Sequence, residues 1–178
     1  MTPEDPKAAL TGYRVIELAS ERCALAGKLL ADMGAEVIVV EPPGGCDTRT
    51  WEPFADDLPG LENSLHWWHY NTSKKSVMVD IETEVGAQQF QSLLATADVV
   101  IEAEPLGRLD ALGLDWNQLR GDESKLIWTS ITHHGRDGGD PPATDLTLLA
   151  EGGPVWSCGY DDQQLPPIRG GGNQAFHT

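Results

Sequence analysis

The chain has 178 residues, with 12 lysines and arginines against 28 aspartates and glutamates, so its formal net charge is −16 at neutral pH. Hydrophobic residues make up 40% and charged residues 22%, which is ordinary for a globular protein and argues against a disordered acidic tail. Because a nucleic-acid-binding protein needs a basic surface, no nucleic-acid partner is expected.

Apolar runs fall far short of the roughly 18 residues that a membrane-spanning helix needs, so no membrane partner is expected either. Residues 1–10 form an acidic, proline-containing leader that lacks the basic start and apolar stretch of a signal peptide. The cysteines, Cys23, Cys46 and Cys158, are widely spaced and form no C-x-x-C pair. This usage predicts a reducing, cytoplasmic location and no metal framework.

Two strands that flank a helix are the first elements predicted along the chain. Tyr13–Leu18 and Glu36–Val40 are compact runs of β-branched residues, which are typical of buried strands. Between them, apolar residues at helical spacing predict a helix over Ala24–Met33, and Gly34 stands where a helix C-cap belongs. The succession indicates a right-handed, parallel βαβ unit.

A long connection follows, from Gly44 to Tyr70, and it contains three tryptophans. A loop of that length in a compact domain is usually functional, or else it contains short elements. The tryptophan-rich run S-L-H-W-W-H-Y is either the wall of an acyl pocket or, as we favour, core or a subunit contact.

The remainder of the chain alternates strands and helices and then becomes rich in glycine and proline. Strands are predicted at Ser76–Ile81, Asp98–Ile101 and Lys125–Ile131, and helices at Thr83–Leu94, Leu106–Leu112, Trp116–Arg120 and Asp145–Ala150. The alternation predicts an α/β fold, an open, mostly parallel sheet with helices on both faces, in a single domain over 1–178. Residues 154–178 are expected to be a tail that leads toward a further C-terminal part.

Ligands of such sheets bind at the carboxyl ends of the strands. Five segments answer that description: Ala19–Cys23, Glu41–Cys46, Asp80–Glu82, Glu102–Pro105 and Thr132–Gly139. The sequence contains neither G-x-G-x-x-G after the first strand nor G-x-x-x-x-G-K-[ST] anywhere. A nicotinamide dehydrogenase and a P-loop NTPase are therefore excluded.

Six blocks follow one another in the order and spacing of a known family. They are Gly12–Leu18, Leu29–Gly45, Asn71–Ile81, Ala97–Glu102, Leu109–Trp116 and Leu126–Thr132. Each block alone is a weak signal, but G-A-E-V-I-V-V-E-P-P-G followed by N-T-S-K-K-S-V-M-V-D is specific. From about Leu10 onward the chain resembles the N-terminal part of class III CoA-transferases, the group that contains formyl-CoA and carnitine CoA-transferases and α-methylacyl-CoA racemase.

This resemblance implies a Rossmann-like domain that binds acyl-CoA, in an interlocked homo- or heterodimer with a homologous subunit. In that family an aspartate attacks the acyl-CoA thioester, and CoA passes through an enzyme-bound thioester to a second carboxylic acid. Coenzyme A is thus expected as substrate, without a metal. By resemblance, the coenzyme A contacts are placed at Glu21, Arg22, Lys74, Lys75, Val79 and Leu112.

The family's nucleophilic aspartate has no counterpart in Pro166–Thr178, which contains neither Asp nor Glu. Its expected position falls within Asn173–Phe176, where an amide oxygen is too weak a nucleophile to form an anhydride. Pro42, Glu82 and Ala111 also stand where relatives often carry cations, which weakens the attraction of anionic coenzyme A. The alternative is a catalytically silent, structural subunit, as in heteromeric benzylsuccinate CoA-transferase.

Asp145 corresponds to a family position for an active-site acid that positions the reacting groups. Aspartate is also a favoured helix N-cap residue, and the two roles can coexist. Thr144 precedes it where the racemase branch has a catalytic histidine, so racemase chemistry loses support and is only the third alternative. His66, His69, His133 and His134 lack a carboxylate or cysteine at ligand spacing, so no metal site is expected.

Overall fold

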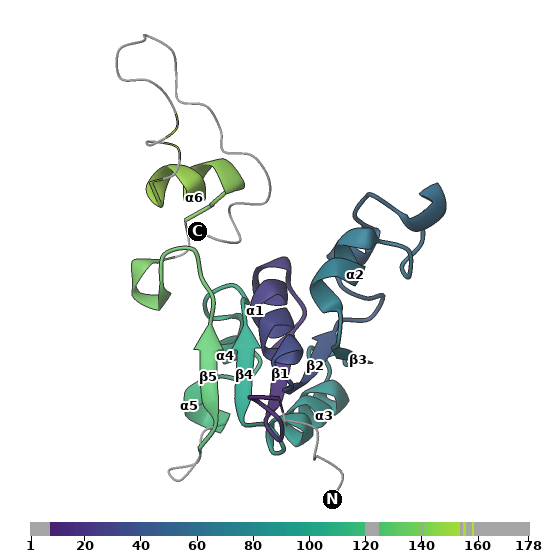
Figure 1. The fold of residues 1–178 in the computed structure, drawn as a ribbon. Helices are drawn as coiled ribbons and strands as arrows, with labels where there is room; N and C mark the ends of the chain where they lie inside the picture. The colour runs from purple at the N-terminus through teal and green to yellow at the C-terminus, as the bar shows by residue number, and fades with distance from the viewer. Residues whose placement is uncertain (1–7, 120–124, 140, 154, 156–157, 159–178) are drawn as a thin grey trace, which may run out of the picture. The chain divides into compact units, whose positions relative to one another are not determined.

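The computed structural model describes residues 8–119, 125–139, 141–153, 155 and 158 (Figure 1). Contacts divide the chain into two compact units, Met1–Thr132 and His133–Thr178. The predicted leader and tail fall largely outside the described residues, and the single domain stays a prediction. No helix within the described residues is long and apolar enough to cross a bilayer.

Five parallel strands form the sheet of the first unit, in the order β3-β2-β1-β4-β5. Their bounds are β1 Arg14–Leu18, β2 Glu36–Glu41, β3 Lys75–Met78, β4 Val99–Glu102 and β5 Ile127–Ser130. In register, Ile16 of the central strand lies between Ile38 on one side and Val100 on the other. Chain order runs outward from β1 to β3 and then resumes at β4, so the topology reverses between β1 and β4.

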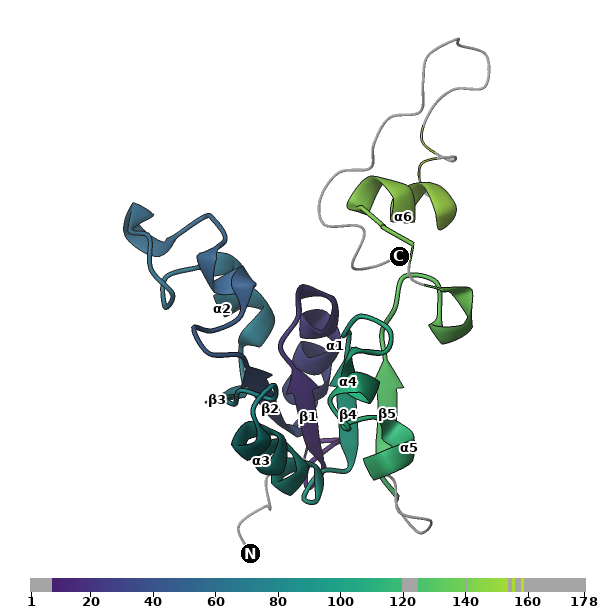
Figure 2. The same ribbon diagram turned by 180° about the vertical axis from the view of Figure 1, so that it is seen from behind.

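Helices cover both faces of this sheet, as Figures 1 and 2 show from opposite sides. On one face α1, Glu21–Asp32, packs Cys23 and Ala31 against Val15 and Val37. On the other lie α3, Glu84–Leu94, and the short α4, Arg108–Ala111, and α5, Trp116–Leu119. Buried Phe90 belongs to this second layer, and such burial stabilises the fold by roughly 1.5–3 kcal/mol per large side chain. The predicted Rossmann-like α/β fold is confirmed.

The long connection after β2 contains short elements, the second of the two alternatives. These are η1 Asp47–Thr50, η2 Ala55–Asp57 and α2 Leu65–Asn71. Trp67 of α2 is buried against Val39 and Cys46, whereas neighbouring Trp68 is half exposed. Helical periodicity turns adjacent side chains in different directions, so the tryptophan pair is divided between core and surface.

Side-chain caps set the starts of two helices, and of these α1 starts three residues earlier than the expected Ala24, whereas α6 starts at Asp145 as expected. α1 begins at Glu21, since the Ser20 hydroxyl accepts a hydrogen bond from the Arg22 amide. In the second unit α6 spans Asp145–Glu151, and Thr144 is its N-cap, in a reciprocal capping box with Thr147. The expectation that Asp145 is the cap is therefore wrong: Asp145 is the first helical residue.

Candidate functional site

A cavity of about 610 Å³ opens in the first unit at the carboxyl ends of β1, β2, β3 and β4. Open α/β sheets bind ligands at this edge, near the strand where the order reverses. The lining comes from Leu18 at the end of β1 and residues 19–22 after it, from Val40 in β2 and Pro42, Pro43, Cys46, Asp47, Thr48 and Trp51 after it, from 79–82 after β3, and from 103–105 with Arg108 after β4. Four of the five predicted segments thus meet around one cavity; the fifth, Thr132–Gly139, belongs to the second unit from His133 onward.

The cavity is lined by more carboxylates than cations. The carboxylates are Glu21, Asp47, Asp80, Glu82 and Glu104, and the cations are Arg22 and Arg108. Arg108 donates to Glu82 over 2.8 Å and pairs with Glu104 at 2.9 Å. Within the described part of the chain, the Arg22 guanidinium makes no ion pair. Arg22 is thus the cation of the lining that no described carboxylate pairs.

Glu104 has an altered acidity at this edge. Its side chain is 17% exposed, and burial raises its pKa although the Arg108 guanidinium lowers it in part. Glu102 and Glu82 add to the upward shift of the pKa. A carboxyl group with raised pKa in a cavity takes up a proton more readily than an exposed one, which is a common property of functional sites.

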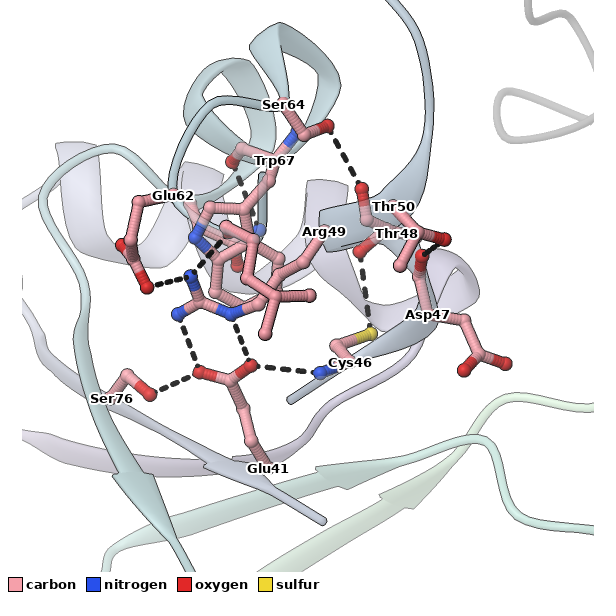
Figure 3. Close-up of polar contacts among 12 residues, drawn as sticks. Glu41, Cys46, Asp47, Thr48, Arg49, Thr50, Glu62, Ser64, Trp67 and Ser76 are labelled. Carbon is pink, nitrogen blue, oxygen red and sulfur yellow. Dashed lines mark hydrogen bonds and ion pairs between the residues drawn. The ribbon is translucent and has the colours of Figure 1, made fainter. Parts of the chain in front are cut away.

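The wall of the cavity after β2 is held by a buried ion pair between Glu41 and Arg49 (Figure 3). Arg49 Nε lies 2.6 Å from Glu41 Oε2, and Arg49 Nη2 lies 2.8 Å from Glu41 Oε1. The guanidinium also lies 4.0 Å from the centre of the Trp67 ring. Bidentate hydrogen bonds between an arginine and a carboxylate are stronger than hydrogen bonds between neutral groups, and the contact with the aromatic ring adds a cation–π attraction.

Further bonds tie the same carboxylate to the loop that lines the cavity. Glu41 Oε2 accepts the Cys46 amide over 2.9 Å, and the Ser76 hydroxyl of β3 donates to Glu41 Oε1. Burial alone raises the pKa of Glu41, but the Arg49, Ser76 and Cys46 hydrogen bonds outweigh it, so the pKa lies below its ordinary value. Glu41 is therefore ionised at neutral pH and fixes where the loop turns.

Ser64 fastens the other end of this connection. Its hydroxyl lies 2.9 Å from the Thr48 carbonyl and 2.8 Å from the Trp51 carbonyl, and it accepts the Trp67 amide as the N-cap of α2 (Figure 3). Thr48 in turn donates to the Cys46 sulfur over 3.3 Å. No sequence pattern indicates this network, because its members are separated by loops. The one available signal is Glu41, a glutamate that ends a buried strand.

The predicted coenzyme A contacts divide into two groups. Glu21, Arg22 and Val79 line the cavity, whereas Lys74, Lys75 and Leu112 lie outside it. Leu112 packs against the core, and Lys75 pairs with Glu36 at 2.6 Å. Contact of each residue with coenzyme A stays a prediction.

Lys74 makes a buried ion pair with Glu17 of β1 at 2.8 Å, and both side chains are 1% exposed. The ammonium group also donates to the Ala24 carbonyl and to Asn71 Oδ1. Burial lowers the pKa of Lys74 and raises the pKa of Glu17. The pair is covered by α1 at Gly27, where an added Cβ would lie 1.6 Å from Glu17 Oε2.

Asp145 belongs to the second unit, so its role as a positioning acid stays a prediction. Asn173–Phe176, the expected position of the nucleophile, lie outside the described residues. Among the histidines, the His66 ring lies 4.9 Å from the Trp51 ring and 4.8 Å from the Tyr70 ring. No group of three or more metal-ligating side chains occurs within the described ranges.

Residues 10–178 match CoA-transferase family III. Over 166 residues the chain is 37% identical to succinyl-CoA:(R)-benzylsuccinate CoA-transferase subunit BbsE of Thauera aromatica, covering 92% of this chain and 40% of that protein. It is 45% identical over 136 residues to succinate–glutarate CoA-transferase of Agrobacterium fabrum, covering 74% of this chain and 34% of that protein.

A solved structure gives the same result. The crystal structure of a CAIB/BAIF family protein from Brucella suis has a TM-score of 0.82 and 37% identity to this chain, covering 96% of this chain and 46% of that one. The chain spans about 40% of the length of the Thauera relative. By sequence and by fold, this chain belongs to CoA-transferase family III.

Proposed function

We propose that this chain is the N-terminal, acyl-CoA-binding part of a class III CoA-transferase. It moves CoA between an acyl-CoA thioester and a carboxylic acid together with further polypeptide, either its own continuation or a homologous subunit in an interlocked dimer. The observation that carries this proposal is the cavity at the switch point of the sheet, in a chain of this family.

The cavity has features that suit coenzyme A. Its volume of about 610 Å³ lies within the usual range for small-molecule sites. Arg22 lies in the first turn of the 12-residue helix α1, whose positive dipole end favours negative groups such as phosphates. Val79 and Ile81 add apolar surface to the lining.

The transfer requires a carboxylate as nucleophile. Its oxygen attacks the thioester carbonyl carbon, the carbon–sulfur bond breaks, and CoA leaves as a thiolate from an acyl anhydride. The thiolate then attacks the enzyme's own carbonyl carbon, which forms an enzyme–CoA thioester and releases the donor acid as a carboxylate. An acceptor carboxylate then attacks the carbonyl carbon of the enzyme–CoA thioester, which expels CoA thiolate and forms a second anhydride. The thiolate attacks the acceptor's carbonyl carbon in that anhydride, so the new acyl-CoA leaves and the enzyme carboxylate is regenerated.

A silent structural subunit is the second candidate, because Pro166–Thr178 contains no carboxylate at the expected position of the nucleophile. The Thauera relative is a subunit of its enzyme, which also favours assembly of this chain with another one. In this case the chain contributes its fold, and the partner contributes the carboxylate.

Hydroxylamine trapping separates the two candidates. The complete protein is incubated with succinyl-CoA and hydroxylamine, beside a reaction without protein that measures direct reaction of the thioester. Acyl hydroxamate above that background identifies a covalent acyl–enzyme, as expected for the transferase. No hydroxamate, in a protein that binds CoA by calorimetry, leaves the structural subunit.

Calorimetry with coenzyme A tests the binding step separately. Arg22→Gln removes the cation in the first turn of α1 and is expected to weaken coenzyme A binding about tenfold. Equal affinities of the variant and the wild type would place Arg22 outside the binding site. Racemase chemistry predicts exchange of the acyl α-proton in deuterated water, and we expect none.

A further inference from the structure

Arg108 is the second cation of the cavity, and its guanidinium is occupied by two carboxylates. Nη2 lies 2.8 Å from Glu82 Oε1, and Nη1 lies 2.9 Å from Glu104 Oε2. The three side chains come from two separate segments: Glu82 follows β3, whereas Glu104 and Arg108 follow β4. In the sheet order, β2 and β1 lie between those strands, so the Arg108–Glu82 pair joins segments on opposite sides of the cavity.

Local structure holds each member in place. Glu82 is fixed by its amide, which donates to Asp80 Oδ1 over 3.2 Å, and the Glu104 amide donates to Glu102 Oε2 over 2.8 Å. Gly107 precedes Arg108 with φ of 80°, a left-handed conformation that glycine adopts without strain and that starts α4. The contact is therefore built by the backbone of two loops.

We propose that Glu82 and Glu104 are specificity-determining residues, which restrain anion binding in the cavity by holding the Arg108 guanidinium. An incoming anion must displace at least one carboxylate from Arg108 before it gains that cation. The restraint lowers the affinity of anions that bind through Arg108 relative to ligands that do not use this cation. The identity of the anion as coenzyme A rests on the proposed function.

The charges around the cavity support this restraint. With five carboxylates and two arginines in the lining, and one arginine already paired twice, an anionic ligand meets an acidic surface. The Coulomb energy between partly exposed charges is modest and falls with salt. Removing one carboxylate beside Arg108 should therefore change affinity severalfold rather than by orders of magnitude.

The test is a gain of affinity, which misfolding cannot produce. Glu82→Gln keeps the side-chain shape at a position that is 64% exposed and removes one charge. By calorimetry at low salt, it should bind coenzyme A about three- to tenfold more tightly than the wild type. The gain should be absent in Glu82→Gln/Arg108→Gln and should shrink at about 1 M salt.

Asp32→Asn is the matched control, since it also removes one charge from an exposed ion pair, with Lys28, on α1 and outside the cavity. Equal affinities of Glu82→Gln and Asp32→Asn would overturn the inference. If no variant binds coenzyme A, the proposed function fails, and inorganic pyrophosphate decides the inference separately. Tighter pyrophosphate binding by Glu82→Gln than by Asp32→Asn supports it; equal or absent binding overturns it.

Discussion

The carboxylate of Glu41 and the guanidinium of Arg49 meet in two hydrogen bonds, of 2.6 and 2.8 Å, beneath the wall of the cavity. Their side chains are 4% and 11% exposed. Glu41 ends the second strand, and Arg49 lies in the 3-10 helix that follows. This pair therefore connects the sheet to the long connection that carries Cys46, Asp47, Thr48 and Trp51.

Arg49→Met should lower the free energy of unfolding by about 3 kcal/mol, because it leaves the Glu41 carboxylate buried without its cation. Arg49→Lys should lose less, since it keeps the charge but not the two-pronged contact. Urea unfolding measures both. As a control, Lys28→Met removes an i,i+4 pair on α1 and should cost about 0.5 kcal/mol or less. Equal losses for Arg49→Met and Lys28→Met would contradict the prediction.

Stability at low pH should depend on Glu41. Its pKa in the folded protein lies below its ordinary value, so the unfolded chain binds the proton more readily. The stabilisation is present above the unfolded-state pKa of about 4.3 and is lost as pH falls through the lower folded-state pKa. The stability difference between wild type and Glu41→Gln, measured by urea unfolding from pH 7 to pH 3, should therefore shrink with acid. A constant difference would mean that Glu41 does not titrate in this way.

Gly27→Ala should destabilise the first unit by about 1–3 kcal/mol, because the new Cβ would lie 1.6 Å from Glu17 Oε2 and push α1 away from the buried ion pair. Gly60→Ala is the comparison: its Cβ would meet the Asn63 side-chain amide at 3.2 Å, in an exposed loop. Its effect should stay within about 0.5 kcal/mol. Thermal unfolding of both variants tests whether the close approach at Gly27 is essential.

Ser64→Ala should loosen the cavity wall and destabilise the protein by about 1–2 kcal/mol. The loss of its bonds to the Thr48 and Trp51 carbonyls should make the buried Cys46 thiol react faster with a thiol reagent. Both proteins carry Cys158→Ser, so that this cysteine does not contribute to the measured rate. Cys23 contributes little, because it is fully buried and burial raises the pKa of its thiol.

Thr83→Ala is the matched control variant. Thr83 is the N-cap of α3, where its hydroxyl accepts the Gly86 amide, and it is not part of the cavity lining. It should cost a similar free energy without changing the Cys46 rate. The same increase in both variants would show that Cys46 reacts through general unfolding, and the Ser64 prediction would fail.

The ion pairs illustrate what sequence patterns leave undecided. Lys74 and Lys75 are adjacent in the sequence and were both predicted to contact coenzyme A. In the structure Lys74 is buried against Glu17, and Lys75 pairs with Glu36. Arg108, in contrast, lines the cavity. Whether a cation lines the cavity depends on which end of a strand it lies at and on which side chains lie next to it in space. The spacing of residues in the sequence does not give these neighbours.

From the sequence alone, the sheet, its parallel strands, the helices on both faces and the family were predictable. Runs of β-branched residues and helical periodicity are local properties, and the family motifs follow one another along the chain. The tertiary structure alone decided the Glu41–Arg49 pair, the burial of Lys74 and the Arg108 contacts with Glu82 and Glu104. The Glu41–Arg49, Lys74–Glu17 and Arg108–Glu82 pairs join separate elements or segments of the chain, and electrostatic pairing depends on distance in space.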